Sequence, residues 1–365
     1  MQEILTSLEQ LKMSDNFSIP IVNTHYVSKL AKDYLSGKEI NTLNPGVPVL
    51  NQLIIKAAER KFSAEKRILL VDALLQQYEK DGIKLEKDSN VYKNILSLND
   101  SHTFSFTTGQ QIHIFLGPLF FLYKIQSLIG HVKNFNKNSD TFKSIPIFWM
   151  ATEDHDLAEI NYVKLYGETF TWETTAGNAV GRITCEGLPE LIDKIEDRAD
   201  KTQENTELFK LFKKHYLSHI TLAAATRSLL HEIFNDEGLV IMDADDKVLK
   251  QSFANVALKD IEEKVVFNSV KEKNAILKKS GYEPRVNPQE INFFWLDSQK
   301  RIKLKIKDGQ IQKEQTSEII SLEQIQKTPE KLSPNVLLRP IYQESILPNI
   351  MYLGCLLYTS PSPRD

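Results

Sequence analysis

Two short apolar runs, each followed at once by acidic residues, constrain the fold of this chain more than any other feature. The first run covers residues 145–150 and precedes residues 153–156, while the second covers residues 239–242 and precedes residues 243–246. Unbroken apolar runs of this length are typical of strands buried on both faces of a parallel sheet. Segments with helical periodicity separate them. This alternation predicts an α/β fold with a Rossmann-like core, a helical N-terminal layer and small β inserts.

The segment between residues 104 and 150 is predicted to form a strand, a loop, a helix and the first apolar strand. Gly117 and Pro118 open the helical pattern. Proline is favoured just inside a helix start, because its missing N–H would have no partner there. The residues that recur at helical spacing are Leu119, Leu122, Tyr123, Gln126 and Ile129.

The loop and the helix start in this segment could bind an anion such as phosphate. A helix N-terminus offers unbonded N–H groups and the positive end of the helix dipole. The candidate residues are Gly109, Gln110, Gln111, Gly117, Pro118 and Lys124. The alternative is a turn in which the glutamines cap backbone groups and Lys124 is solvated. The residues by themselves favour the turn, because they match neither the Walker loop nor the dinucleotide-binding fingerprint.

The ionisable residues after the first apolar run form the strongest candidate for a catalytic site. In open α/β sheets, ligands bind past the carboxyl ends of the strands. The candidate catalytic residues are Asp154, His155 and Asp156, with His155 as a general base whose tautomer a carboxylate fixes. Charged groups this close should perturb one another's pKa values. A structural polar cluster is the alternative, and Asp154 or Asp156 could also hold a magnesium ion.

A second acidic group and one arginine are further candidates. Asp243, Asp245 and Asp246 follow the second apolar run and are predicted to lie at the same sheet edge as residues 152–156. Asp245 or Asp246 would also serve as the N-cap of the next helix. Arg339 follows a third predicted strand, residues 336–338. There it would bind a substrate carboxylate or phosphate, or pair with an internal acid.

The remaining segments are expected to be helices and small β inserts. Residues 162–185 alternate apolar and polar side chains between turn glycines, which predicts a β ribbon. Residues 188–237 are predicted to be helical, and residues 248–280 to be one long helix or a broken pair. Asp308 and Gly309 are a hairpin signal between two alternating runs.

Composition excludes several classes of protein. A net charge of −3 lacks the basic surplus of nucleic-acid-binding proteins. The longest apolar runs are interrupted by glycine and proline and are too short to cross a bilayer, and the N-terminus lacks the features of a signal peptide. Two cysteines in 365 residues exclude a disulfide framework and a cysteine-rich zinc site. We therefore expect a cytoplasmic protein that binds neither nucleic acid nor membrane and holds no zinc.

Five groups of residues, taken in order, resemble the bacillithiol biosynthesis cysteine-adding enzyme family. The first is Thr-Gly-Gln-Gln with Gly-Pro-Leu, within residues 107–119. The second is Trp-Met-Ala-Thr-Glu-Asp-His-Asp with Glu-Ile-Asn, within residues 149–161. The others are residues 238–246, 286–292 and 332–343. His113, Leu116 and the region 41–53 depart from the family pattern.

The resemblance implies a ligase that adds cysteine to glucosaminyl malate in the last step of bacillithiol biosynthesis. Forming an amide from a free carboxylate requires activation, so ATP or a related nucleotide is expected, through either an acyl-adenylate or an acyl-phosphate. Glu153, one of the four ionisable residues after the first apolar run, is expected to bind substrate or nucleotide, and the resemblance adds Thr152 and Asn161 to that group. The rival interpretation is a non-catalytic nucleotide-binding or scaffolding protein.

The family pattern also implies domain boundaries. Residues 1–354 correspond to the family's N-terminal Rossmann-like domain. Residues 355–365 are rich in serine and proline, and we expect them to be an exposed, non-native tail. The coiled coil that follows in the family is missing from this sequence, so we expect a truncated chain. Homo-oligomers formed through that coiled coil are expected of full-length relatives.

Overall fold

The computed structural model describes residues 20–25, 27–36, 49–174, 179–297 and 300–354. Pro48–Gly354 forms one compact unit. The described residues that precede this unit contain a 3₁₀ turn, Ile21–Asn23, and the helix α2, Lys29–Leu35. The tail expected at residues 355–365 lies outside the described residues, so its exposure remains a prediction.

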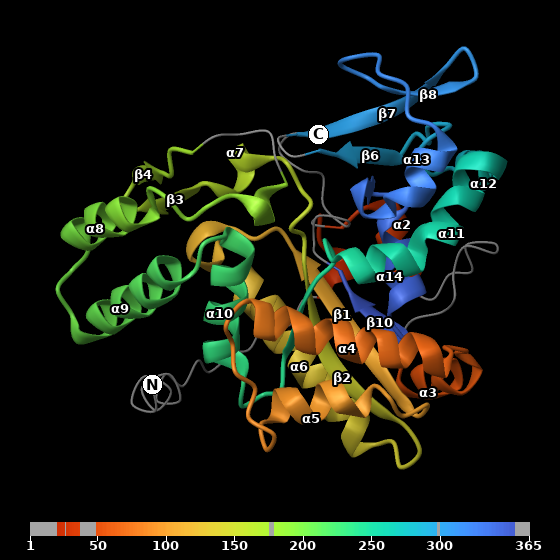
Figure 1. Cartoon of the computed structure of the whole chain (residues 1–365). Coiled ribbons are helices and arrows are strands. Elements are labelled where there is room, and N and C mark those ends of the chain that lie inside the picture. Colours follow the sequence, from red (N-terminus) through yellow and green to blue (C-terminus); the bar gives the residue numbers. More distant parts are fainter. Residues whose placement is uncertain (1–19, 26, 37–48, 175–178, 298–299, 355–365) are drawn as a thin grey trace. The chain divides into compact units, whose positions relative to one another are not determined.

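Four parallel strands form the central sheet of the compact unit (Figure 1). They lie in the order β10-β1-β2-β5, and their bounds are Thr103–Gln110 for β1, Lys143–Met150 for β2, Val240–Asp243 for β5 and Asn349–Leu353 for β10. Met150 pairs with Asp243 at the end of the β2–β5 register. The two apolar runs are therefore neighbouring parallel strands, which confirms the predicted α/β fold class and the predicted pairing.

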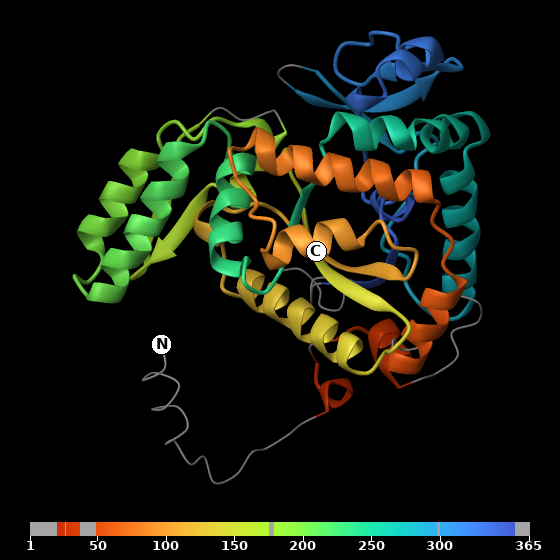
Figure 2. The same cartoon turned by 60° about the horizontal axis from the view of Figure 1, so that its bottom comes forward.

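Helices cover the strands. α6 (Phe120–Lys137) packs on β1 and β2, and α3 (Leu50–Glu59) contacts β10. Three helices contact β5, and they are α4 (Ala64–Lys80), α5 (Asn90–Ser97) and α10 (Leu222–Phe234). Figure 2 shows α4 (orange) and α6 (gold) on different sides of the strands. The sheet is thus buried on both faces, as its continuous apolar runs require.

The remaining helices fill the connections between strands. α7 (Leu157–Ile160), α8 (Leu188–Arg198) and α9 (Gln203–Ser218) lie between β2 and β5 in the chain. α11 (Lys247–Glu263) and α12 (Val265–Lys279) are the predicted broken pair, divided at Lys264, which has a φ of 52°. α13 (Leu322–Lys327) and α14 (Arg339–Ile346) follow. Among the described helices, none is long and apolar enough to cross a membrane.

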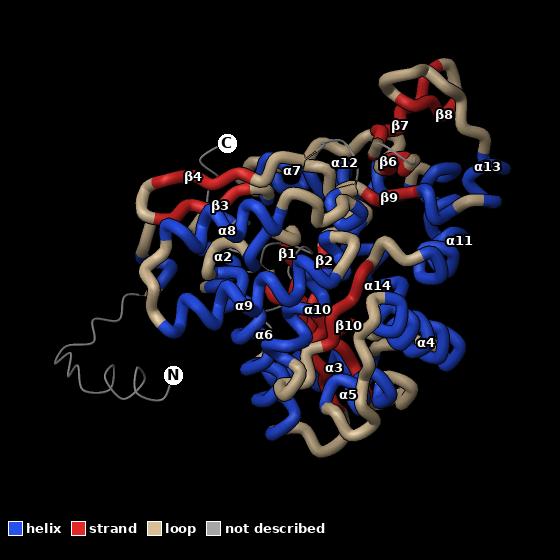
Figure 3. Tube along the Cα trace, turned by 60° about the vertical axis from the view of Figure 1, so that its left-hand side comes forward, coloured by secondary structure: helices blue, strands red, loops and turns tan. Residues whose placement is uncertain are grey.

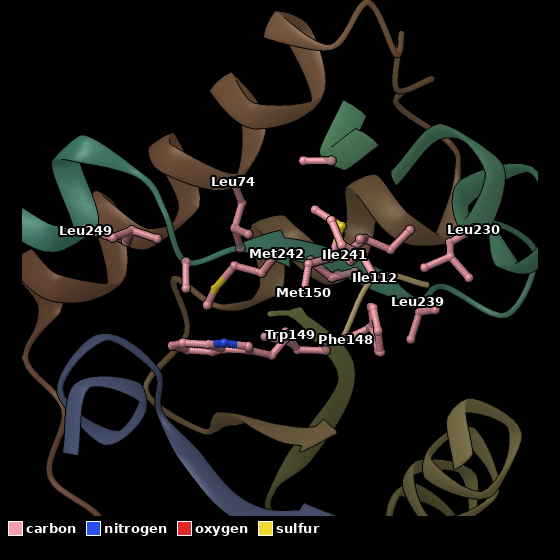
Figure 4. Close-up of a cluster of buried hydrophobic side chains, with 14 of the residues drawn as sticks. Leu74, Ile112, Phe148, Trp149, Met150, Leu230, Leu239, Ile241, Met242 and Leu249 are labelled. Carbon is pink, nitrogen blue, oxygen red and sulfur yellow. The ribbon is translucent and has the colours of Figure 1, made fainter. Parts of the chain in front are cut away.

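Side chains from strands and helices meet in one hydrophobic core (Figure 4). Met150 of β2 and Met242 of β5 come from neighbouring strands, Leu74 of α4 lies above Met242, and Leu249 of α11 lies nearby. All four side chains are fully buried. Burying a side chain of this size stabilises the fold by about 1.5–3 kcal/mol. This core fixes α4 and α11 against the end of β5, where the acidic residues begin.

Two small antiparallel sheets stand apart from the central sheet (Figure 3). β3 (Tyr162–Leu165) and β4 (Glu168–Thr171) form the predicted ribbon. The second sheet has the order β8-β7-β6-β9, with the bounds Phe293–Leu296 for β6, Arg301–Lys307 for β7, Gln310–Lys313 for β8 and Leu332–Pro334 for β9. Asp308 and Gly309 have positive φ in the turn between β7 and β8, which confirms the hairpin prediction.

The prediction of a strand at residues 336–338 is wrong. These residues form a turn that leads into α14, and Arg339 is the first residue of that helix. The side chain of Asn335 accepts hydrogen bonds from the N–H groups of Leu337 (2.9 Å) and Leu338 (3.3 Å). Such local bonds compete with strand pairing. The strand that completes the sheet is β10, which the sequence analysis missed.

The helix predicted after Gly117 and Pro118 is confirmed as α6, but its start is shifted. The helix begins at Phe120, so Pro118 lies before its N-cap, Leu119, rather than just inside the helix. Leu119 and Tyr123 are 60% and 64% exposed, and the buried face is formed by other side chains. That face consists of Phe121, Ile125, Leu128, Ile129, Val132 and Phe135. Apolar residues occur on both sides of this helix start, so helical spacing alone does not show which side is buried.

Candidate functional site

The acidic segments that follow β2 and β5 lie together at the carboxyl edge of the sheet. Because Met150 and Asp243 are register partners, the residues that follow them emerge side by side. The Thr152 hydroxyl donates a short hydrogen bond to the Asp243 carboxylate, which also accepts from the N–H of Asp245 at 2.9 Å. This contact confirms the prediction that both segments share one edge.

A network of four charged side chains, of which Arg182 is exposed, joins these segments. Lys250 of α11 is 2% exposed, and its Nζ lies 2.6 Å from Glu153 Oε1 and 2.7 Å from Asp245 Oδ1. Arg182, in the 3₁₀ turn Val180–Arg182, binds both oxygens of Asp245 at 2.6 and 2.9 Å. Buried charges are tolerated when they are paired in this way. The sequence analysis missed Lys250 and Arg182, because nothing in their own neighbourhoods marks them.

The two carboxylates that share Lys250 have different electrostatic environments. Burial would raise the pKa of Asp245, but the charges and hydrogen bonds of Lys250 and Arg182 outweigh it and lower that pKa. Burial raises the pKa of Glu153 more than Lys250 lowers it, and the charge of Asp245 adds to the rise. Asp245 is therefore the ionised partner of Lys250, and Glu153 is the carboxyl group that accepts a proton more readily.

A cavity of about 340 Å³ lies next to Glu153, and we call it the arginine cavity. Its polar lining comes from Glu153, Asp154, Arg301, Asn335 and Arg339, and Phe294 is among its apolar walls. Among the residues that the structure describes, the Arg339 guanidinium has no hydrogen bond or ion pair. A partly buried cation without a partner favours an anionic ligand. The carboxylates beside it would suit a neighbouring ammonium group.

Arg301, the first residue of β7, forms the other basic wall. Its guanidinium stacks on Phe294 at 3.9 Å from the ring centre, and donates to Ser333 Oγ at 3.0 Å and to the Pro334 carbonyl at 3.2 Å. These contacts hold it in one orientation over the cavity. The sequence analysis did not select Arg301, because an arginine within an alternating β hairpin is usually solvent-exposed.

The guanidinium of Arg301 also changes the role that His155 can play. Arg301 Nη1 lies 3.1 Å from His155 Nδ1. Arginine can only donate, so Nδ1 must accept, and the proton of a neutral His155 ring then sits on Nε2. Asp154 Oδ1 is farther from Nδ1, at 3.7 Å. In this arrangement His155 orients Arg301, rather than presenting a free base fixed by a carboxylate.

Asp154 is held ionised at the mouth of the arginine cavity. Burial would raise its pKa, but hydrogen bonds from Gln111 and from the His155 N–H, with the charges of Arg301 and Arg339, lower it. Gln111 Nε2 donates to Asp154 Oδ2 at 2.9 Å and to Glu159 Oε2 at 2.7 Å. Gln111 thus joins the end of β1 to the loop after β2.

A second cavity, of about 550 Å³, is also lined by Thr152, and we call it the aspartate cavity. Its acidic lining comes from Asp81, Asp243, Asp245 and Asp246, with Arg182 and Arg227 among its basic residues. Asp246 is the N-cap of α11 and accepts from the N–H groups of Val248 and Leu249. Asp246 therefore both caps α11 and lines the aspartate cavity. Thr152 lines both cavities.

The predicted phosphate-binding loop has mostly structural contacts. Lys124 Nζ donates to the Gly109 carbonyl at 2.6 Å and lies 3.5 Å from Gln110 Oε1. A Cβ on Gly109 would lie 3.3 Å from the Trp149 carbonyl, so this glycine allows close packing of β1 on β2. A Cβ on Gly117 would clash with the His113 side chain at 2.5 Å. Neither cavity is lined by these residues.

The start of α6 does not fit an anion. The N–H groups of Phe121, Leu122 and Tyr123 already bond to the carbonyls of Pro118 or Leu119. Leu119 and Phe120 are exposed apolar side chains at the same end of the helix. Both features remove the unbonded, polar surroundings that an anion needs at a helix start.

Two further candidate residues lie outside the cavities. Asn161 bonds to the backbone of Trp172, through its carbonyl at 2.7 Å and its side chain at 3.2 Å, and so joins α7 to the end of β4. Asp156 is exposed and is the N-cap residue of α7. Within the described part of the chain, no group of three or more His, Cys, Asp or Glu side chains is arranged to hold a metal ion.

Comparisons with known proteins agree on one family. The family model described as the N-terminal Rossmann-like domain of bacillithiol biosynthesis BshC matches residues 17–355. Three of the most similar curated relatives each carry the name "Putative cysteine ligase BshC". The relative from Flavobacterium johnsoniae is 40% identical over 337 residues, which is 90% of this chain and 62% of that protein.

The other two relatives come from Flavobacterium psychrophilum and Cytophaga hutchinsonii. They are 36% identical over 339 residues and 34% identical over 344 residues. These alignments cover 90% and 92% of this chain, and 62% and 63% of the relatives. The chain therefore spans somewhat less than two thirds of the curated relatives that it matches.

Proposed function

Because the chain belongs to the bacillithiol biosynthesis BshC family, we propose that it carries the active site of a cytoplasmic ligase that joins cysteine to glucosaminyl malate. One observation carries the proposal. Two guanidinium groups, on Arg301 and Arg339, and two carboxyl groups, on Glu153 and Asp154, line one cavity at the carboxyl edge of the sheet. This charge pattern suits a substrate that has carboxylates and an amine close together.

In the proposed complex, the malyl carboxylates pair with Arg301 and Arg339. Bidentate pairing of guanidinium with carboxylate gives both affinity and orientation. The glucosamine nitrogen then lies near Glu153 and Asp154. Asp154 stays ionised and attracts the ammonium form, while Glu153 accepts the proton that must leave before nitrogen can attack. Neighbouring carboxyl groups whose pKa values are shifted in opposite directions suit these two roles, proton acceptor and fixed negative charge.

Cysteine is proposed to occupy the aspartate cavity, with its ammonium group on Asp243 and its carboxyl group toward Thr152. The two cavities meet at Thr152, so both substrates approach the same place. The nitrogen of glucosaminyl malate attacks the activated carboxyl carbon. After Glu153 has taken one proton from the ammonium group, a C–N bond forms and the bond from that carbon to the leaving oxygen breaks. The second proton that the nitrogen loses passes to the departing oxygen.

A nucleotide would supply the leaving group, since a free carboxylate does not form an amide unaided. The residues at the predicted phosphate site do not fit it, because the first-turn N–H groups of α6 are bonded to Pro118 and Leu119. The predicted magnesium site does not fit either. Asp154 is bonded to Gln111 and to the His155 N–H, and no metal-binding group forms around it in the described chain. No step is therefore assigned to nucleotide phosphate or metal.

The direct test is product formation from cysteine, glucosaminyl malate and ATP, measured by mass spectrometry. The amide product should form with the unaltered protein and should be lost in Arg339→Gln. The matched control is Arg285→Gln, which changes an exposed arginine that lines neither cavity. The rival function, a non-catalytic nucleotide-binding or scaffolding protein, predicts thermal stabilisation by ATP without any product.

A further inference from the structure

The outer edge of β5 is completed by side chains instead of a further strand. β5 is the last strand in the order β10-β1-β2-β5, so one row of its backbone groups has no strand partner. Unpaired edges of this kind are usually covered or blunted. Here Ile241 N–H donates to Tyr78 Oη at 2.9 Å, and Arg227 Nε donates to the Ile241 carbonyl at 3.3 Å.

Gln77 completes this edge at Asp243. Its Oε1 accepts from the Asp243 N–H at 2.9 Å, and its Nε2 donates to the Asp243 carbonyl at 2.9 Å. A single amide thus makes the same pair of bonds that a neighbouring strand would make. The two bonds fix the backbone of Asp243 at the point where its carboxylate meets Thr152 and the Asp245 N–H.

The orientation of the Gln77 amide is itself determined. Arg227 Nη2 donates to Gln77 Oε1 at 3.0 Å, and Arg227 is ion-paired with Asp81. Arginine can only donate, so the amide oxygen must face both Arg227 and the Asp243 N–H. Gln77 is 5% exposed and Arg227 is 2% exposed. A flipped amide would place donors against donors in a buried place, which is unfavourable.

We propose that Gln77 is a positioning residue that holds the Asp243 carboxylate for the ammonium group of cysteine, with Arg227 and Asp81 fixing Gln77. The inference rests on the proposed function in one respect, the identity of the ligand. It goes beyond that function because a residue on α4, outside both acidic segments, then sets the affinity for one of the two substrates. Tyr78 makes an edge bond of the same kind two residues away, at Ile241, and provides a matched control.

The test compares Gln77→Met, Gln77→Glu and Tyr78→Phe in the full chain. Gln77→Met removes both bonds to Asp243 while keeping the length of the side chain. Gln77→Glu keeps the acceptor for the Asp243 N–H and for Arg227. We expect Gln77→Met to raise the KM for cysteine by about tenfold to a hundredfold and to leave the KM for glucosaminyl malate within about twofold, in keeping with the cost of misplacing a group. Gln77→Glu should recover part of that loss.

Tyr78→Phe should lower the melting temperature but leave both KM values within about twofold, because its bond does not involve Asp243. Equal effects of Gln77→Met on both KM values, or an increase in the KM for cysteine in Tyr78→Phe, would overturn the inference.

Hydrogen exchange resolved to single amides separates this inference from the proposed function. Gln77→Met should speed exchange at Asp243 by at least tenfold, and Tyr78→Phe should do so at Ile241. If the protein shows no ligase turnover but the Asp243 amide responds, the proposed function fails and the positioning contact stands. If the Asp243 amide does not respond in a folded Gln77→Met protein, the positioning role is wrong whatever the activity.

Discussion

Glu153 and Asp154 are neighbours in the chain, but their surroundings push their pKa values in opposite directions. Burial raises the pKa of Glu153, while hydrogen bonds from Gln111 and the His155 N–H, with two nearby arginines, lower the pKa of Asp154. A carboxyl group that is to remove a proton from an ammonium group works best with a raised pKa. In the proposed reaction, this difference favours Glu153 as the proton acceptor and Asp154 as the fixed negative charge.

The first prediction follows from that assignment. Glu153→Gln should lower kcat by about a hundredfold or more, the size expected for loss of a general base. The rise of kcat with increasing pH, which reports ionisation of the Glu153 carboxyl group, should disappear with it. His155→Ala should cost less than about tenfold, because His155 acts through Arg301. A hundredfold loss in a folded His155→Ala protein, measured by steady-state kinetics, would instead make His155 the base, as the sequence analysis expected.

A second prediction concerns Asp243, whose pKa is raised by burial and by the charge of Asp245, against the opposing effect of Arg227. A group with a raised pKa in the folded state favours folding at low pH, and that contribution is lost as the pH rises through the folded value. Ionised Asp243 therefore costs stability at pH 7.

Asp243→Asn should accordingly raise the melting temperature at pH 7 by roughly 2 °C, while weakening cysteine binding. The gain should shrink as the pH falls toward the ordinary value of 3.8. Calorimetry across this pH range measures it. A variant that is less stable than the unaltered protein at pH 7 would show that the carboxylate is stabilising.

At the scale of the element, the first turns of α11 carry both the cap of the helix and a lysine of the candidate site. Asp246 caps this helix, and Lys250 follows within its first turns and binds Glu153 and Asp245. Ser321 caps α13 in a complete capping box and lines neither cavity. The two caps therefore provide a matched pair that separates helix stability from activity.

The third prediction uses this pair. Asp246→Ala and Ser321→Ala should each lower the free energy of unfolding by about 1 kcal/mol, the usual cost of losing a side-chain cap. Only Asp246→Ala should also lower turnover, because fraying of α11 displaces Lys250 and its two carboxylates. Denaturant unfolding and kinetics on the same samples measure both effects. Equal activity in the two variants would show that Lys250 does not depend on the cap.

Helices and strands could be predicted from the sequence where one local residue pattern was strong. The buried strands β2 and β5 and the hairpin at Asp308 each have a strong local signature. The prediction failed at residues 336–338, where the side chain of Asn335 bonds two following N–H groups and turns the chain. β10 was missed because a short strand is defined by its partner β1 more than by its own residues.

At the scale of the whole molecule, some residues of the candidate site could be predicted from the sequence and others could not. Asp154, Glu153, Asp243 and Asp245 were found because each follows a recognisable strand. Arg301, Lys250, Arg182 and Gln77 come from other parts of the chain and meet these acids only after folding. Local sequence patterns do not predict these contacts, because the contacts depend on how helices and hairpins pack around the sheet edge. By contrast, Gly117 and Asn161 belong to the motifs found in the sequence, but the contacts that they make in the fold are structural.

The last prediction tests the arginine cavity in the intact protein, without any turnover. A ligand that binds only the folded state raises stability by RT ln(1 + [L]/Kd), which is about 2.7 kcal/mol at a hundredfold excess over Kd. Sodium malate carries the two carboxylates that Arg301 and Arg339 are proposed to hold. It should raise the melting temperature by about 4 °C at such an excess, and sodium chloride of equal ionic strength should not.

Arg339→Gln should abolish this shift while leaving the free protein about as stable as before, because within the described residues Arg339 makes no hydrogen bond or ion pair that the change would remove. Arg285→Gln should retain the full shift, since that exposed side chain lines neither cavity. Differential scanning fluorimetry on the three proteins measures all of these values. Equal stabilisation of Arg339→Gln by malate would place the anion elsewhere and would remove the main support for the proposed substrate.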